Sequence, residues 1–252
     1  MRLSISAQSH TGHVRTNNED MILIGNRYVR DEVYEITLPL DTDTPPLLIA
    51  LADGMGGHNA GEVASEQTLQ SLSAFAGSLP AGLSPEELTH AFSEWIQAAH
   101  SHLLEMGTST PSCQGMGTTL VGLCIYAGRA YWFNCGDSRI YRLAGGKLQQ
   151  LSTDHSYEWA TGVKGFSNVI TNCVGAAGEV FLDMAPVPHF AAAADGSADT
   201  YLLCSDGLSD LVDDEQLARF LRAEATAPAL VRMALQAGGR DNVSAVTVRV
   251  GL

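Results

Sequence analysis

The sequence is poor in basic residues. Among its 252 residues, Lys and Arg together number 14 while Asp and Glu number 28, which gives a formal net charge of −14. A surface this acidic would be repelled by nucleic-acid backbones and by anionic lipids. We therefore expect no nucleic-acid partner. The 45% of hydrophobic and 17% of charged residues nevertheless describe a globular chain that can bury a core.

Cysteine pairs and long apolar runs are also missing. The five cysteines are widely spaced and none forms a Cys-x-x-Cys pair, which argues against a disulfide or a zinc site and favours small buried side chains. The first six residues lack the continuous apolar segment of a secretory signal. No apolar run approaches the roughly 18 residues that span a membrane. We predict a cytoplasmic protein without membrane insertion.

The pattern of apolar residues alternates between strands and helices. Strands are expected over 21–24, 47–52, 118–126, 130–134, 138–143, 147–151, 201–204 and 243–250. Helices are expected over 62–75, from the N-cap Ser84 to about Leu103, over 213–223 and over 228–236. The connectors are too short to separate domains. The chain therefore reads as one α+β domain, 1–252, in which two packed antiparallel sheets form a β-sandwich flanked by helix pairs.

Aspartates stand at the ends of several predicted strands. Asp53 follows the apolar run 47–52 and opens the stretch Asp-Gly-Met-Gly-Gly-His, while Asp206 follows the run 201–204. Asp241 precedes the last strand, and Asp137 lies between two strands. Each could be an ordinary solvated turn, but several such aspartates in one chain favour a common site. Carboxylate and carbonyl oxygens are the ligands that Mg²⁺ and Mn²⁺ prefer, which points to metal-assisted hydrolysis.

The segment before the first predicted strand holds a candidate phosphate ligand. Arg15 precedes Asn17-Asn18-Glu19-Asp20, and a guanidinium can grip a phosphate through its planar fork. The alternative is an exposed ion pair with Glu19 or Asp20. The glycines after Asp53 do not form a P-loop, because the Lys-Ser/Thr that follows such a loop is absent. The sequence also argues against a kinase, since no Gly-x-Gly-x-x-Gly loop with a downstream strand lysine is present.

Six motifs occur in a fixed order from one end of the chain to the other. They are Arg15…Asn18-Glu19-Asp20, Asp53–His58, Gly117-Thr118-Thr119, Gly136-Asp137-Ser138-Arg139, Ser205-Asp206-Gly207 and Arg240-Asp241-Asn242. In this order they resemble the metal-dependent serine/threonine protein phosphatases of the PPM, or PP2C, type, most closely in their bacterial form. The resemblance covers essentially the whole chain.

The resemblance implies a role for each candidate residue. Two Mn²⁺ or Mg²⁺ ions would be bridged by Asp53, with the Gly54 carbonyl on one ion and Asp206 and Asp241 on the other. Glu19 and Asp20 would hold ion-bound waters, and Asp137, with Asp206 or Asp210, would form a weaker third site. Arg15 would orient the phosphate while a hydroxide made by the ions attacks phosphorus. The implied partners are phosphorylated proteins and a cognate Ser/Thr kinase, and the implied state is a monomer.

Two departures from the family pattern stand out. Met55 occupies the position where animal members carry a histidine proposed as the acid for the leaving group, and His58 is either a substitute acid or a structural residue. The segment 154–175 is expected to form an abbreviated version of the family's flap. Two other functions stay open: a regulatory module of this fold without catalysis, although the full aspartate set argues against it, and a phosphohydrolase for small molecules.

Overall fold

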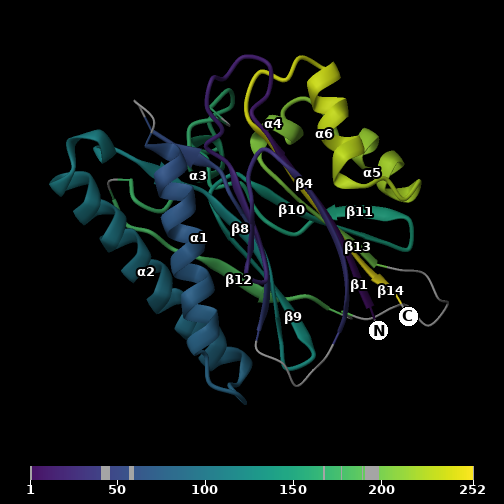
Figure 1. Ribbon diagram of the computed structural model, residues 1–252, viewed down its shortest axis with the longest axis horizontal. Coiled ribbons are helices and arrows are strands. Elements are labelled where there is room, and N and C mark those ends of the chain that lie inside the picture. Colours follow the sequence, from purple (N-terminus) through teal and green to yellow (C-terminus); the bar gives the residue numbers. More distant parts are fainter. Residues whose placement is uncertain are drawn as a thin grey trace.

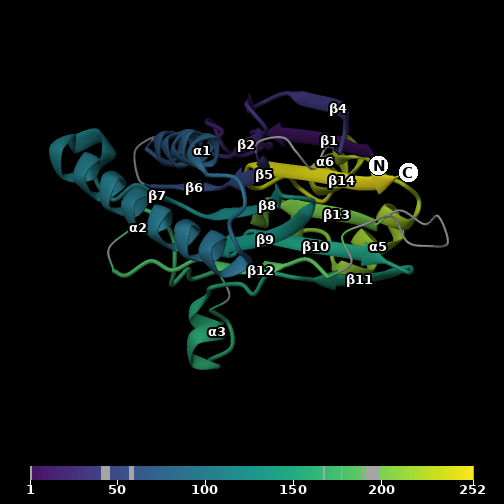
Figure 2. The same ribbon diagram turned by 90° about the horizontal axis from the view of Figure 1, so that it is seen from below.

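The computed structural model describes residues 2–40, 46–56, 60–166, 168–176, 178–188, 190 and 199–251. Two six-stranded antiparallel sheets pack face to face (Figures 1 and 2). The first has the order β11 (Lys147–Gln150), β10 (Arg139–Ala144), β13 (Asp199–Cys204), β14 (Val243–Gly251), β1 (Arg2–His10), β4 (Val33–Pro39). The second has the order β12 (Asp183–Pro186), β9 (Arg129–Cys135), β8 (Leu120–Tyr126), β5 (Leu47–Ala52), β2 (Met21–Ile24), β3 (Arg27–Val29). A short ribbon pairs β6 (Gly54–Met55) with β7 (Gly117–Thr118).

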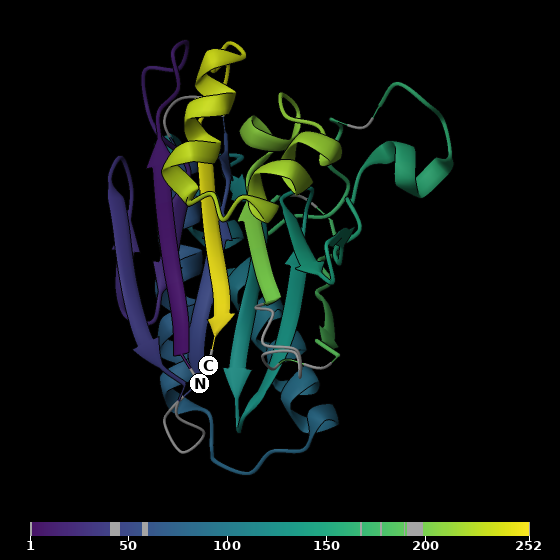
Figure 3. The ribbon, with the colours of Figure 1, turned by 90° about the vertical axis from the view of Figure 1, so that its right-hand side faces the viewer.

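Helices cover the outer faces of both sheets. The long helices α1 (Gly61–Ser78) and α2 (Pro85–Ser109) cover the second sheet, and a 3-10 turn, η1 (Pro111–Cys113), follows them. The helices α4 (Asp206–Ser209), α5 (Asp214–Arg222) and α6 (Ala227–Gln236) lie on the first sheet. The short α3 (Tyr157–Thr161) stands away from the sheets (Figures 2 and 3). This arrangement confirms the predicted fold class. No helix in the described part of the chain has the length and apolar character needed to cross a membrane.

Strand β5 shows why an interior strand of this sandwich can be apolar along its whole length. Its residues point alternately to opposite faces of the sheet. Ile49 and Leu51 lie in the core between the two sheets, whereas Leu48, Ala50 and Ala52 lie in the core beneath α1 and α2. Both faces of the sheet are therefore buried, and the strand cannot show the half-polar alternation of a solvated sheet.

Helix α2 begins where its sequence signals it should. The Ser84 hydroxyl accepts a hydrogen bond from the Glu87 amide at 3.2 Å, and the Glu87 carboxylate accepts one from the Ser84 amide at 2.8 Å. Pro85 occupies the first turn, where its missing N–H costs nothing. This capping box and the buried face that includes Phe92 and Trp95 confirm the prediction for this helix.

The sequence patterns missed the strands β1, β3, β4, β6 and β12 and the short helices α3 and α4. Strand β1 alternates Leu3, Ile5 and Ala7 into the core with polar residues between them. Its apolar residues are few and small, so the alternation is weak as a signal. Strand β4 lies at the edge of the first sheet and is only half-buried. All five cysteines are buried and free, as predicted.

Candidate metal centre

Strand register brings the predicted aspartates to one end of the sandwich. In the second sheet Met21 pairs with Ala52, so the preceding Asp20 and the following Asp53 meet. In the first sheet Cys204 pairs with both Arg139 and Ala245. The turns next to these three residues carry Asp206, Asp137 and Asp241. Antiparallel pairing thus collects carboxylates from residues as far apart as 20 and 241.

Asp20, Asp53 and Asp206 form the centre of the cluster. Asp53 has both Asp20 and Asp206 as near neighbours in this cluster. Burial and the neighbouring carboxylates Asp20 and Asp206 raise the pKa of Asp53 well above its ordinary value. Burial, followed by the charge of Asp241, raises the pKa of Asp206 to about 6. Negative charges held this close together need a cation or protons to compensate them.

Asp20 supplies the observation that tests whether a cation fits. Its side chain is fully buried, and burial raises its pKa to about 7. One carboxylate oxygen accepts a hydrogen bond from the Ser205 hydroxyl at 2.9 Å, while Oδ1 has no hydrogen-bond partner. A buried oxygen without a donor is costly, and an ion-bound water would satisfy it. The donor set, carboxylates with a free acceptor behind them, fits a hard divalent cation.

The centre is not a preformed cage of side chains. Among the described residues, no three acidic, histidine or cysteine side chains already stand in the arrangement of a metal-binding group. The predicted ligands, however, include a backbone carbonyl, and Mg²⁺ usually keeps several of its waters. A site of that kind needs few carboxylates directly on each ion. The absence of a three-residue cage is therefore compatible with it.

Gly54 is required by the packing of the centre. A Cβ atom at this position would lie 2.1 Å from the carbonyl oxygen of Gly61 and 2.7 Å from that of Glu19. The Gly54 amide donates to the Glu19 carbonyl at 3.2 Å. Burial, followed by the charge of Glu62, raises the pKa of Glu19, whose carboxylate accepts from the Gly61 amide at the start of α1. Glu19 and Gly54 are thus held together at the rim of the centre.

Arg15 and Asp241 form an ion pair at the rim. The Arg15 Nη2 atom lies 2.7 Å from Asp241 Oδ2, and the two side chains are 53% and 37% exposed. The sequence suggested Glu19 or Asp20 as the ion-pair partner of Arg15, and the actual partner lies 226 residues away. This placement puts an exposed guanidinium directly beside the carboxylates of the centre.

Asn242 fixes the loop that carries Arg15, a role that the sequence did not reveal. Its amide nitrogen donates to the carbonyls of Thr11 and Asn17, both at 2.9 Å, and its oxygen accepts from the Glu19 amide at 2.8 Å. Its position directly after Asp241 was the one available signal. Ser205, which supports Asp20, was likewise visible only as the neighbour of Asp206.

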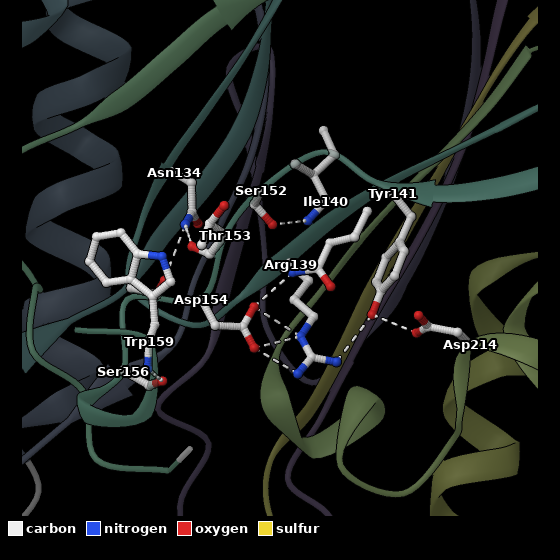
Figure 4. Close-up of polar contacts among 12 residues, drawn as sticks. Asn134, Arg139, Ile140, Tyr141, Ser152, Thr153, Asp154, Ser156, Trp159 and Asp214 are labelled. Atoms are coloured by element: carbon white, nitrogen blue, oxygen red, sulfur yellow. Dashed lines mark hydrogen bonds and ion pairs between the residues drawn. The ribbon is translucent and has the colours of Figure 1, made fainter. Parts of the chain in front are cut away.

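A second acidic pocket adjoins the centre. A cavity of about 40 Å³ is lined by seven residues: Asp137, Arg139, Asp154, Asn168, Asp206, Ser209 and Asp210. Burial, followed by the charge of Asp206, raises the pKa of Asp137 to about 7, and burial also raises the pKa of Asp210. Arg139 grips both oxygens of Asp154 at 2.7–3.0 Å and also reaches the Tyr141 hydroxyl, which donates to Asp214 (Figure 4). The predicted third-site residues Asp137 and Asp210 therefore share one cavity with Asp206.

Gly207 in α4 packs closely against the backbone of Asn242, next to the metal centre. A Cβ atom here would lie 1.9 Å from the carbonyl oxygen of Asn242. Because this oxygen belongs to the backbone, it can move away only if the main chain shifts. We expect Gly207→Ala to lower the free energy of unfolding by about 2 kcal/mol, measured by urea denaturation. The matched control is Gly77→Ala in α1, where nothing lies within 4 Å of the added atom. That helix substitution should stabilise by about 0.5 kcal/mol, and equal effects at the two positions would contradict the expectation.

Comparison with known proteins identifies the family of the chain. The family model described as "Protein phosphatase 2C" matches residues 39–236. The serine/threonine protein phosphatase PstP of Mycobacterium tuberculosis is 32% identical over 98% of this chain. The chain belongs to the protein phosphatase 2C family. It spans only 45% of the length of PstP, but 92% of the serine/threonine phosphatase stp of Listeria monocytogenes, with 31% identity over 94% of this chain.

A solved protein phosphatase 2C structure extends the comparison to metals. The crystal structure of the PstP catalytic domain contains two manganese ions. Its likeness to this chain has a TM-score of 0.75 with 32% identity, and it covers 99% of this chain and 100% of that one. One predicted residue cannot be compared with the centre, because His58 lies outside the described residues. Met55, which stands where animal members carry a histidine, is half-buried in β6.

Proposed function

We propose that this protein phosphatase 2C domain, residues 1–252, hydrolyses phosphoserine and phosphothreonine in proteins with the help of two Mn²⁺ or Mg²⁺ ions. The observation that carries the proposal is the cluster of buried strand-end carboxylates around Asp53, whose pKa is raised by burial and by the charges of Asp20 and Asp206. Such a cluster is destabilising by itself, and cations of high charge relieve it. The two manganese ions in the PstP catalytic domain support the same composition.

The residues divide the work by their positions. Asp53, the Gly54 carbonyl, Asp206 and Asp241 would hold the two ions, and Glu19 and Asp20 would hold the waters around them. Bound ions supply an activated water and neutralise charge on the phosphate. Arg15, exposed at the rim beside Asp241, would bind the phosphate oxygens through its fork and hold phosphorus in line for attack. A third, weaker ion would use Asp137 and Asp210 in the adjoining cavity.

The proposed partners follow from the family of the chain and from its relatives, which are named serine/threonine phosphatases. The substrates would be proteins that a cognate Ser/Thr kinase has phosphorylated, and the domain would reverse the action of that kinase. The chain would work as a monomer in the cytoplasm. Its net charge of −14 disfavours nucleic acid as a competing ligand.

Removal of metal tests the proposal directly. Phosphate release from a phosphothreonine peptide should disappear when the protein is treated with a chelator and return when Mn²⁺ is added. Because the ions are required for the attacking water, the loss should exceed about a hundredfold. Sugar and nucleotide phosphates at matched concentration serve as the comparison. Peptide hydrolysis that survives complete chelation would reject the metal mechanism, and faster turnover of small phosphates would reject the substrate class.

A further inference from the structure

His155 is a fully buried ionisable residue that the proposed mechanism does not use. Its ring nitrogen Nδ1 accepts from the Gly136 amide at 3.1 Å, and the Asn172 amide nitrogen lies 2.8 Å from the same atom. A backbone N–H can only donate, so Nδ1 carries no proton. The proton of the neutral ring is therefore on Nε2, which donates to Asp183 Oδ2 at 3.0 Å. The ring is fixed from both sides.

His155 forms hydrogen bonds with Gly136, in the turn that carries Asp137. Besides the bond from its amide to Nδ1, the Gly136 carbonyl accepts from the His155 amide at 3.0 Å and from the Asn134 side-chain amide at 3.1 Å. Gly136 has a φ of +118°, and a Cβ atom there would lie 2.7 Å from Thr119. Its backbone conformation is thus one that few residues adopt. His155 supplies two of the three hydrogen bonds that hold the Gly136 main chain in this conformation.

A second contact fixes the other side of the same turn. Asp154 binds the Arg139 guanidinium through both oxygens, as Figure 4 shows. The neighbouring residues 154 and 155 therefore hold positions 139 and 136, and Asp137 lies between these two anchors. The Asp137 carboxylate, which is 8% exposed, lines the acidic cavity with Asp206 and Asp210.

His155 also holds the base of the segment 154–175, which is expected to form the flap. Its carbonyl accepts from the Thr171 amide at 2.9 Å, and its ring packs 5.5 Å from that of Trp159 in α3. Next to it, Ser156 bridges to Ile170 and closes the neck of the flap. One residue thus connects the outgoing and returning chains of the flap with the turn of Asp137.

On the basis of the proposed function, we propose that His155 is the positioning residue that holds the Asp137 carboxylate and the neck of the flap in one frame, through the contact of its Nδ1 atom with Gly136. The arrangement is analogous to a metal-bound histidine oriented by a carboxylate, with a backbone amide in place of the metal. Asp183 orients the ring, and the ring orients the turn. His155 itself touches neither substrate nor ion.

Two substitutions separate the two ring nitrogens. In His155→Asn, the side-chain oxygen takes the place of Nδ1 and can still accept from Gly136. In His155→Gln, the terminal amide takes the place of Nε2, reaches Asp183 and leaves the Gly136 amide without an acceptor. The first readout is amide hydrogen exchange by NMR in the metal-free protein. We expect exchange at Gly136 to accelerate about tenfold or more in His155→Gln and less than about threefold in His155→Asn.

The second readout is binding of Mn²⁺ by calorimetry. The weakest binding step should weaken about tenfold in His155→Gln and stay within about threefold of wild type in His155→Asn. Equal effects of the two substitutions, or none from either, would overturn the proposal, because a residue that only fills space does not distinguish its nitrogens. If His155→Gln does not fold, Asp183→Ala at a half-exposed position must accelerate Gly136 exchange instead, and unchanged exchange there overturns the proposal. Metal-independent or absent phosphatase activity of the wild type would refute the proposed function, whereas the exchange comparison would still decide the role of His155.

Discussion

Asp53→Asn should lower Mn²⁺-dependent phosphatase activity by about a thousandfold while making the metal-free protein more stable. The activity falls because Asp53 is the carboxylate proposed to bridge both ions. The stability rises because the substitution removes a negative charge from between Asp20 and Asp206, whose charges raise the pKa of Asp53. Shape is conserved, so packing changes little. Steady-state kinetics and urea denaturation in a chelator measure the two effects.

The opposite signs of these effects make the test specific. A substitution that merely damaged the fold would lower activity and stability together. Glu215→Gln, on the exposed side of α5, serves as the matched control and should change neither quantity. Retention of more than about a tenth of the wild-type activity in Asp53→Asn would contradict a bridging role. A less stable metal-free variant would contradict the electrostatic account of the cluster.

The convergence of the aspartates was predictable, because it follows from strand ends. Each apolar run that leads into an aspartate, as at Ala52–Asp53, predicted a carboxylate at the end of a strand. The structure shows that the antiparallel register places those strand ends together. The elements that build the layers of the fold could also be predicted from the sequence. The capping box predicts the start of α2, and the unbroken apolar run predicts β5. A local sequence signal was enough to predict a feature wherever that feature depends on a single helix or strand.

Contacts between distant loops were not predictable in this way. The sequence offered an ion pair with Glu19 or Asp20 as the alternative to a phosphate-binding role for Arg15. In the structure Asn242 instead holds the loop of Arg15 against the last strand and brings Arg15 to Asp241. The contacts of Asn242 are hydrogen bonds from one side chain to backbone atoms, which leave no pattern in the sequence. The same holds for His155, whose partners Gly136 and Asp183 lie on two different strand ends. Polar residues that hold backbone in place need the fold before their role can be identified.

The metal-free protein should lose stability as the pH rises from about 4 to about 8. Burial raises the pKa of Asp137 from 3.8 to about 7 in the folded state. A carboxyl whose folded pKa lies above its unfolded value favours folding fully below pH 3.8, and this contribution is lost as the pH rises through about 7. Because each pH unit is equivalent to about 1.4 kcal/mol, Asp137 alone accounts for a loss of up to about 4 kcal/mol. Asp20 and Asp206, whose pKa values burial raises to about 7 and about 6, act in the same direction.

Urea denaturation across this pH range, in a chelator and then in Mn²⁺, measures the effect. Asp137→Asn is the control that removes one ionisation, so its stability should fall less steeply than that of the wild type. Saturating Mn²⁺ should reverse the trend, because ions bind the ionised carboxylates and stabilise the folded state by about 3 kcal/mol at a hundred times the dissociation constant. Parallel pH curves for wild type and Asp137→Asn would show that this carboxyl is not the strained group inferred here. A wild-type curve that Mn²⁺ leaves unchanged would mean that the repulsion among the buried carboxylates is relieved by protons alone, and the cluster would then have no need of a cation.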